Sequence, residues 1–384
     1  AHAADRYVIA TGENAILDEE ISFLEGPALP DGEADSFFLP QPTEDRFSLY
    51  EHAARALDLA VARTGVHGLP LILGGDWNDG MNRVGHKGQG ESVWLGWFLA
   101  GTLKSFLAYA EERGDSARVA RWTAHLTELA SALESAGWDG EYYRRGYFDD
   151  GTPLGSAQSE ECRIDSIAQS WSVLSHQAPP EHAAAAVDAA VAKLVDDEAG
   201  IIRLFTPPFE KTAADPGYIK AYPPGVRENG GQYTHAAIWL GMALAELGRD
   251  DDAWRCFNIL NPLKHALDAD AAERYRVEPY VVAADVYGDG AYLGRGGWTW
   301  YTGSAGWLYR FAVEGILGVT RRGDTLFVRP CLPPEWQGFE ATLTIAGRVY
   351  GIAVKRSKDG GYEVTVDGKR LADDAGGFTL AKSR

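Results

Sequence analysis

Two aspartates flank a tryptophan in the stretch GGDWNDGMNRVG, residues 74–85. An Asx turn, in which a carboxylate accepts a hydrogen bond from a nearby backbone N–H, explains one of them, Asp76 or Asp79. The other is then available for chemistry. Half-sheltered by Trp77 and the glycines, it would have a raised pKa and act as a general acid. We therefore predict one general acid here, while its neighbour holds the turn or a substrate hydroxyl.

Two further segments carry polar groups where helices are expected to begin. PPGVRENGGQYTHAAIWLG contains Arg227, Glu228 and His235, and GRGGWTWYTGSAGWLYR contains Thr302 and Gly303. Helix starts expose unpaired N–H groups and a positive dipole end, which favour anions. Two simpler interpretations stay open, namely that His235 is an ordinary helix residue and that Thr302 is an N-cap. Two such helix starts and an acid-bearing loop together favour a site where phosphate meets sugar.

The sequence lacks the motifs of several other kinds of site. An EF-hand does not fit the opening loop, because Met81 takes the place of the invariant glycine and Lys87 that of the final glutamate. There is no Gly-x-Ser-x-Gly elbow, no HExxH motif and no paired cysteine motif. The glycines at 294–297 do not form a dinucleotide fingerprint. We therefore predict no metal and no organic cofactor.

The composition and net charge of the chain limit the kinds of partner that it can bind. The net charge of -19 and the pI near 4.9 argue against nucleic acid and anionic membranes, which need a basic surface. The longest apolar stretch is interrupted by Glu91 and Lys104, so no direct membrane insertion is expected, and no signal peptide is visible. Three widely spaced cysteines favour a reduced, cytoplasmic setting. Twelve Trp and seventeen Tyr, many beside glycines and carboxylates, suit stacking on sugar rings, although most are expected in the core.

Amphipathic patterns predict the elements that position these residues. Apolar spacing indicates a mainly α domain at 1–322, and the absence of a fixed repeat favours an (α/α)6 toroid over a regular solenoid. Alternating residues and Asp-Gly turns predict a small all-β domain at 323–384. About eight helices are fewer than the twelve of a six-hairpin toroid, so the chain is expected to be a C-terminal portion of something longer. The helices are predicted at 49–65, 91–114, 116–137, 163–175, 181–196, 233–248 and 304–318.

The motifs GDWNDGMNRVG, ENGGQYTH, EPYVVAADVY and WYTGSAGW, in this order, resemble glycoside hydrolase family 94, the inverting glycoside phosphorylases. The likeness runs from near residue 7 to beyond 340. The residues of these motifs are most similar to those of the phosphorylase-like domain of cyclic β-1,2-glucan synthases and of 1,2-β-oligoglucan phosphorylases. The resemblance implies a β-glucan oligosaccharide and inorganic phosphate as partners, within a larger chain or a homodimer, on the cytoplasmic side of an inner-membrane synthase.

By this resemblance Asp79 is the general acid, and Trp77 lines the subsite of the glucosyl unit that is cleaved off. Glu228 holds the neighbouring sugar, and Arg227 stands where cellobiose phosphorylases carry a lysine. Asp76 remains the residue that supports the turn or a sugar hydroxyl. The phosphate cradle is implied to consist of His235, Thr302 and Gly303.

Two departures from the family pattern matter. Ala283 and Ala284 lie where cellobiose phosphorylases have a glutamine, which favours a different β-glucan. No segment matches the arginine for phosphate, or the Arg and Asp that hold the cleaved glucose, in the first half of the family's barrel. Inverting phosphorolysis, which yields α-glucose 1-phosphate and runs in reverse as synthesis, is the activity that the resemblance implies. An inverting hydrolase, and a non-catalytic part that binds glucan or controls chain length in a synthase, stay open.

Overall fold

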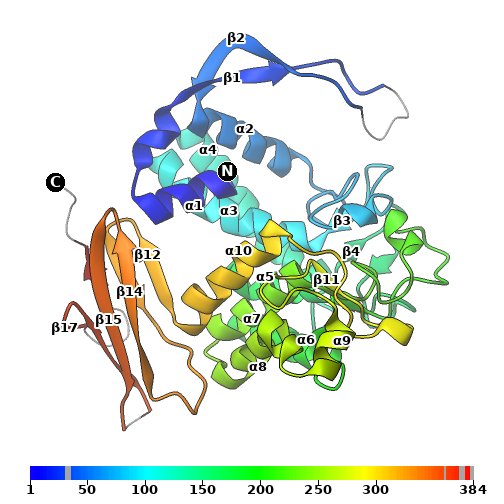
Figure 1. Ribbon diagram of the computed structural model, residues 1–384. Helices are drawn as coiled ribbons and strands as arrows, with labels where there is room; N and C mark the ends of the chain where they lie inside the picture. Colours follow the sequence, from blue (N-terminus) through cyan, green and yellow to red (C-terminus); the bar gives the residue numbers. More distant parts are fainter. Residues whose placement is uncertain (31–35, 359, 372–376, 381–384) are drawn as a thin grey trace.

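Helices are the main regular elements up to Ile316 in the computed structural model, which describes residues 1–30, 36–358, 360–371 and 377–380 (Figure 1). The described ranges contain ten α-helices, several with short 3-10 or π turns beside them. They are α1 (His2–Thr11), α2 (Leu49–Ala62), α3 (Val93–Glu112), α4 (Ser116–Ala132), α5 (Ser166–Leu174), α6 (Pro180–Leu194), α7 (Thr234–Glu246), α8 (Asp250–Leu260), α9 (Ala269–Tyr275) and α10 (Thr302–Arg310).

The helices are arranged in two layers. The helices α3, α5, α7 and α10 lie side by side in one row, and α4, α6 and α8 each pack on the helix that precedes them (Figure 1). Sequence explains the layers, because α3 and α7 bury residues around most of their circumference, whereas α8 has one apolar face and three acids in its first turn. All seven predicted helices are confirmed. The described residues form inner and outer helices but no closed ring.

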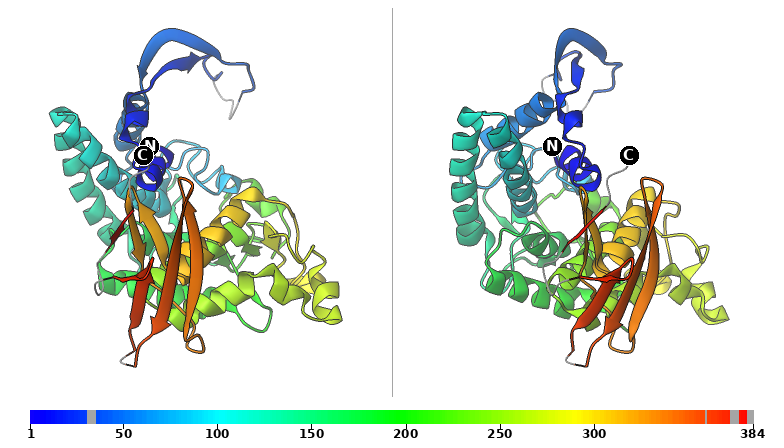
Figure 2. Two further views of the ribbon diagram at one scale, coloured as in Figure 1. Left: turned by 60° about the vertical axis from the view of Figure 1, so that its left-hand side comes forward. Right: turned by 90° about the vertical axis from the view of Figure 1, so that its left-hand side faces the viewer.

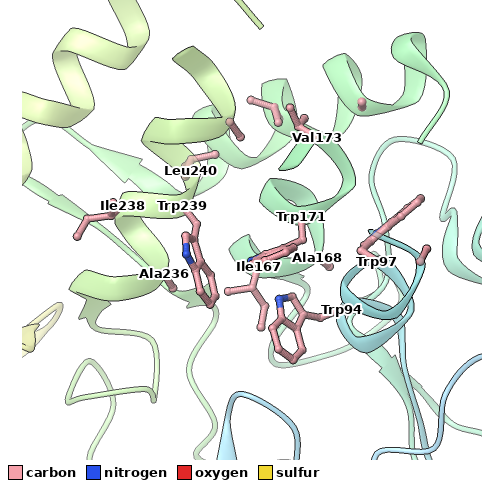
Figure 3. Close-up of a cluster of buried hydrophobic side chains, with 14 of the residues drawn as sticks. Trp94, Trp97, Ile167, Ala168, Trp171, Val173, Ala236, Ile238, Trp239 and Leu240 are labelled. Carbon is pink, nitrogen blue, oxygen red and sulfur yellow. The ribbon is translucent and has the colours of Figure 1, made fainter. Parts of the chain in front are cut away.

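Tryptophans hold the inner helices together. Trp94 of α3, Trp171 of α5 and Trp239 of α7 meet in the core (Figure 3). The Trp171 and Trp239 rings are 5.3 Å apart and perpendicular, and the Trp94 and Trp171 rings are 6.0 Å apart with a similar angle. Such edge-to-face contacts fix both the spacing and the rotation of neighbouring helices. These three tryptophans belong to the aromatic residues that the sequence led us to expect in the core.

Several strands lie among the helices. A long hairpin, β1 (Glu20–Glu25) and β2 (Gln41–Ser48), was not predicted and rises away from the helices in every view (Figure 2). Two-residue strands tie the loops together at β3 (Glu91–Ser92), β4 (Gly146–Tyr147), β5 (Pro153–Leu154), β6 (Ile164–Asp165), β7 (Val195–Asp196), β8 (Ile201–Ile202), β9 (Phe205–Thr206), β10 (Gln232–Tyr233) and β11 (Asp285–Val286).

The C-terminal part is all β, as the alternating sequence indicates. The strands form two antiparallel sheets, ordered β12-β13-β18 and β14-β15-β16-β17. They begin at Val319, slightly before the expected boundary at 322/323. Their bounds are β12 (Val319–Arg322), β13 (Thr325–Val328), β14 (Gly338–Ile345), β15 (Arg348–Arg356), β16 (Tyr362–Val366), β17 (Lys369–Arg370) and β18 (Phe378–Thr379). Over the residues described, no helix is both long and apolar enough to cross a membrane.

Candidate active site

The loop 74–85 is a tight turn whose shape depends on its small and amide residues. Gly75 has a positive φ of 130°, and a Cβ there would lie 3.2 Å from Cα of Asp79. The Asn78 side chain accepts a hydrogen bond from the N–H of Gly80, 3.2 Å away, and so caps the short turn Asp79–Met81. Asp76 makes the predicted Asx turn, since its Oδ1 accepts from the N–H of Asn78 at 3.0 Å.

Asp76 also anchors the loop to the helical core. Its two oxygens accept hydrogen bonds from both terminal nitrogens of Arg145, each at 2.6 Å, and Oδ2 accepts from the Ser92 hydroxyl at 2.7 Å. The Arg145 Nε lies 3.2 Å from Oδ2 of Asp165, and the side chains of Asp76, Arg145 and Asp165 are all fully buried. Of the two roles predicted for Asp76, these contacts favour support of the turn.

We call Asp76, Arg145 and Asp165 the buried triad. Together with Ser92, which donates to Asp76, the triad also fixes the starts of two inner helices. Ser92 is the N-cap of α3 and accepts from the N–H of Leu95, while Asp165 is the N-cap of α5 and accepts from the N–H of Ile167. Burial raises the pKa of Asp165 to about 6, and the positive charge of Arg145 counteracts that rise. These hydrogen bonds and ion pairs therefore attach the acid-bearing loop to the N-terminal ends of α3 and α5.

Trp77 lies on the tryptophan core. Its ring is 5.2 Å from Trp239 and meets Tyr233 and His235 nearly perpendicularly, at 5.4 and 5.5 Å between ring centroids. Because these rings surround it, Trp77 is only partly exposed and its orientation is fixed. It thus offers a rigid apolar face of the kind that stacks on a sugar ring.

Asp79 is exposed, and the shelter that we expected from Trp77 and the glycines is absent. The Trp77 ring packs against the core instead of covering the carboxyl group, and the turn at Gly80 leaves Asp79 at the surface. Its partner is Tyr218, whose pKa is raised to about 12 by burial and by the charge of Asp79 and the hydrogen bond to it. The carboxyl group is therefore accessible to a bound substrate.

A cavity of about 350 Å³ brings five of the eight predicted site residues together, and Arg227, Thr302 and Gly303 are not in its lining. Its lining contains Asp76, Trp77, Asp79, Glu228, Tyr233, His235 and Tyr301. A larger cavity, of about 710 Å³, lies among the C-terminal ends of the inner helices, and none of the predicted site residues lines it. The smaller cavity holds the acid, the aromatic platform and the helix starts, so we take it as the candidate site.

Glu228 points into this cavity from a loop that the sequence singled out. It is 8% exposed, and its Oε2 lies 3.5 Å from Nε of Arg227, although this oxygen has no hydrogen bond within the described ranges. Burial, with the negative charges of Asp79 and Asp285, raises the pKa of Glu228. Asp285 is similar, because burial raises its pKa and its Oδ2 makes no hydrogen bond in the described part of the chain. These carboxyl oxygens are therefore free to accept hydrogen bonds from a ligand or from water.

The two predicted helix starts meet at the same place. His235 lies in the first turn of α7, and a Cβ on Gly303 of α10 would be 3.9 Å from Nδ1 of His235. Thr302 is exposed and occupies the first helical position, so the N-cap interpretation is wrong, and Tyr301 is the cap residue instead. Neither helix has a side-chain cap. The positive ends of two helix dipoles therefore converge beside His235.

His235 is neutral near pH 7. Burial lowers its pKa to about 4, and its Nε2 has no hydrogen-bond partner among the residues described. The imidazole can donate a hydrogen bond to an anion but brings no positive charge. The cavity lining described above contains three carboxyl groups and neither lysine nor arginine. An anion in this cavity would therefore be bound by a hydrogen bond from His235 and by the N-terminal ends of α7 and α10.

Some residues of the site were not predicted. Tyr233 and Tyr301 line the cavity, and Arg145 anchors the loop of Asp76. The negative charge of Asp285 acts on Glu228, and Tyr218 contacts the acid. Tyr233 and Tyr301 lie inside motifs already singled out, and Asp285 lies inside EPYVVAADVY, so their positions in the sequence could have identified them. Arg145 had no local signal, because only the tertiary structure brings it to Asp76.

Comparison with known proteins gives a family match and several relatives. Residues 2–318 match the family described as "Glycosyl hydrolase 94 superfamily, catalytic domain". The chain is 62% identical over 364 residues to the cyclic beta-(1,2)-glucan synthase NdvB of Rhizobium meliloti, covering 95% of this chain and 13% of that protein. It is 29% identical to the solabiose phosphorylase of Paenibacillus borealis, over 97% of this chain and 46% of the relative. It therefore spans less than half the length of these relatives.

A similar fold occurs in a solved structure, the GH78 family rhamnosidase of Bacillus sp. GL1, with a TM-score of 0.53 and 15% identity over 83% of this chain and 29% of that one. At this identity the likeness concerns the fold alone. The family match covers the helical part and includes every predicted site residue. On this match, the chain belongs to the glycosyl hydrolase 94 superfamily.

Proposed function

We propose that this chain carries the site of an inverting glycoside phosphorylase that acts on β-linked gluco-oligosaccharides, with β-1,2-glucan as substrate. The observation that carries the proposal is the meeting of Asp79, Trp77, Glu228 and His235 around one cavity. The 62% identity to a cyclic beta-(1,2)-glucan synthase supports the linkage. We further propose that the helices belong to an (α/α)6 toroid and that the protein acts in the cytoplasm.

In the proposed reaction Asp79 donates its proton to the glycosidic oxygen as the bond from that oxygen to the anomeric carbon breaks. A phosphate oxygen forms the new bond to the same carbon from the opposite face, so the configuration inverts. Since phosphate is already a nucleophile, the second carboxylate with which an inverting hydrolase activates water is not required. The products are α-glucose 1-phosphate and a chain shorter by one unit.

The remaining residues bind and orient. Trp77 stacks on the glucosyl unit that is cleaved off, and Glu228 accepts hydrogen bonds from hydroxyl groups of the neighbouring sugar. Neutral His235 donates to phosphate, which also faces the helix start at Thr302 and Gly303. Because the described lining is acidic, we propose that an arginine from a further part of a longer chain completes the phosphate site.

A second candidate function is a non-catalytic part that binds glucan and controls chain length in a larger synthase. The lack of lysine and arginine in the described lining of the cavity and the 13% share of the synthase covered by the chain favour this alternative. Here the same cavity would bind the sugar chain without turning it over.

One experiment separates these functions. The protein is incubated with linear β-1,2-gluco-oligosaccharides, with and without inorganic phosphate, and glucose 1-phosphate and free glucose are measured. Phosphorolysis gives glucose 1-phosphate only when phosphate is present. Free glucose without phosphate indicates a hydrolase, and calorimetric binding without any product indicates the non-catalytic function.

A further inference from the structure

Four large aromatic side chains, those of Tyr280, Tyr292, Trp298 and Trp300, are exposed on the segment 278–301, just before α10. Tyr280 is 73% exposed, Trp298 56% and Trp300 67%. A single exposed aromatic residue is unremarkable, but a group of them on one segment marks a surface that binds something. We call Tyr280, Trp298 and Trp300 the aromatic shelf.

The shelf is continuous with the candidate site. The Trp298 ring lies 5.8 Å from the ring of Tyr301, which lines the cavity, and the two planes differ by 31°. The Arg227 guanidinium lies 5.0 Å from the same Trp298 ring, and Glu228, the next residue, lines the cavity as well. A ligand that leaves the cavity past Glu228 therefore meets the shelf.

The backbone of the shelf is conformationally strained at Trp300. Trp300 has a φ of 59°, in the left-handed region that bulky residues rarely adopt. Its indole N–H donates to Glu278 at 3.3 Å, and its ring lies 6.2 Å from Tyr280. The N–H of Trp298 donates to Asp285 at 3.0 Å. Strain of this kind is typical of functional sites, and the large exposed fraction of Trp300 means that burial does not account for it.

We propose that the aromatic shelf binds further glucosyl units of an oligosaccharide chain, beyond the sugar held at Glu228 and on the side that keeps the shortened chain. This inference rests on the proposed function. The indole and phenol rings stack on the C–H faces of the sugars, and Glu278 and Arg227 bond to their hydroxyl groups. The occupant is a β-linked gluco-oligosaccharide of three or more units, and the shelf makes affinity grow with chain length.

The test measures binding against chain length in the absence of phosphate. Calorimetric titration with β-1,2-gluco-oligosaccharides of two to five units is carried out on the protein, on Trp300→Ala and on Trp300→Phe. We expect Trp300→Ala to lose about threefold to tenfold in affinity for the pentasaccharide, and little for the disaccharide, while Trp300→Phe retains most of the affinity. Tyr309→Ala, which removes a ring that is 68% exposed on α10, serves as the matched control and should change neither.

Two results would contradict the proposal that the aromatic shelf binds glucosyl units. One is an unchanged dependence on chain length in Trp300→Ala, and the other is an equal loss for both sugars together with a lower melting temperature, which indicates a structural role. The first result is expected if the shelf instead covers another part of a longer chain. Length-dependent binding without any glucose 1-phosphate in the turnover assay contradicts the proposed function alone. Phosphorolysis with no effect of Trp300→Ala contradicts the shelf alone.

Discussion

Replacement of Arg145 by Met tests whether the buried triad holds the acid-bearing loop. The change leaves the carboxyl groups of Asp76 and Asp165 fully buried without their cation. Removing one partner of a buried ion pair costs about 3–5 kcal/mol, a large share of the ~5–15 kcal/mol that stabilises a typical protein. We therefore expect the free energy of unfolding at pH 7, measured with urea and tryptophan fluorescence, to fall by about that amount.

The loss should depend on pH in a defined direction. Asp165 has a folded-state pKa of about 6, above its ordinary value, so the folded protein takes up this proton first as the pH falls. Its burial therefore destabilises the fold above pH 6, and this penalty diminishes as the pH falls from about 6 toward 4. Without the positive charge of Arg145, the Asp165 carboxyl group binds its proton still more readily, so the difference between variant and parent should shrink at pH 5.

Two comparisons sharpen this prediction. Arg83→Met removes an exposed ion pair with Asp215, which is 2.7 Å long, and should cost less than about 1 kcal/mol at either pH. Combining Arg145→Met with Asp76→Asn should cost less than the sum of the two single changes, because one unpaired charge is gone. A loss in Arg145→Met as small as that of the surface control, or one that is equal at pH 5 and pH 7, would refute the role given to the triad.

Two predictions concern the proposed chemistry. Asp79→Asn should lower turnover on natural linkages by about 10² to 10⁴ while calorimetry still detects sugar binding, and a substrate whose leaving group needs no proton should restore much of the rate. Near-normal turnover on the natural glucan would remove Asp79 from the mechanism. His235→Ala should raise the KM for phosphate roughly tenfold or more, since a hydrogen bond to an anion is lost, and should change the KM for glucan little. Equal changes in both constants would count against the phosphate cradle.

Periodic and motif-based features of the fold were predictable from the sequence. The helix of residues 233–248 and the alternating strands after Gly318 carry their own patterns, and the structure places both where these patterns indicate. The β1–β2 hairpin lacked such a pattern, because its strands are mostly exposed. The α8 helix, with three acids in its first turn, was likewise not predicted, although Ala253, Cys256 and Leu260 form a buried face.

At the site, local signals identified groups but could not describe their surroundings. The spacing of Asp76 and Asp79 gave the Asx turn and the candidate acid, yet whether Trp77 shelters Asp79 depends on where Trp239 lies, more than 150 residues later. Similarly, the assignment of Asp76 to the turn depends on Arg145. Contacts across long separations decide burial, and therefore pKa and role, and no local pattern contains them.

The central claim is that phosphate, and not water, attacks the sugar in this site. The most direct measurement is the initial rate of product release from linear β-1,2-gluco-oligosaccharide as phosphate is varied, with the anomer of the product followed by NMR. We predict no turnover without phosphate, a rate that saturates as phosphate increases, and the α anomer of glucose 1-phosphate as the first product. Sugar release that is independent of phosphate, or a β-configured product, would contradict the account.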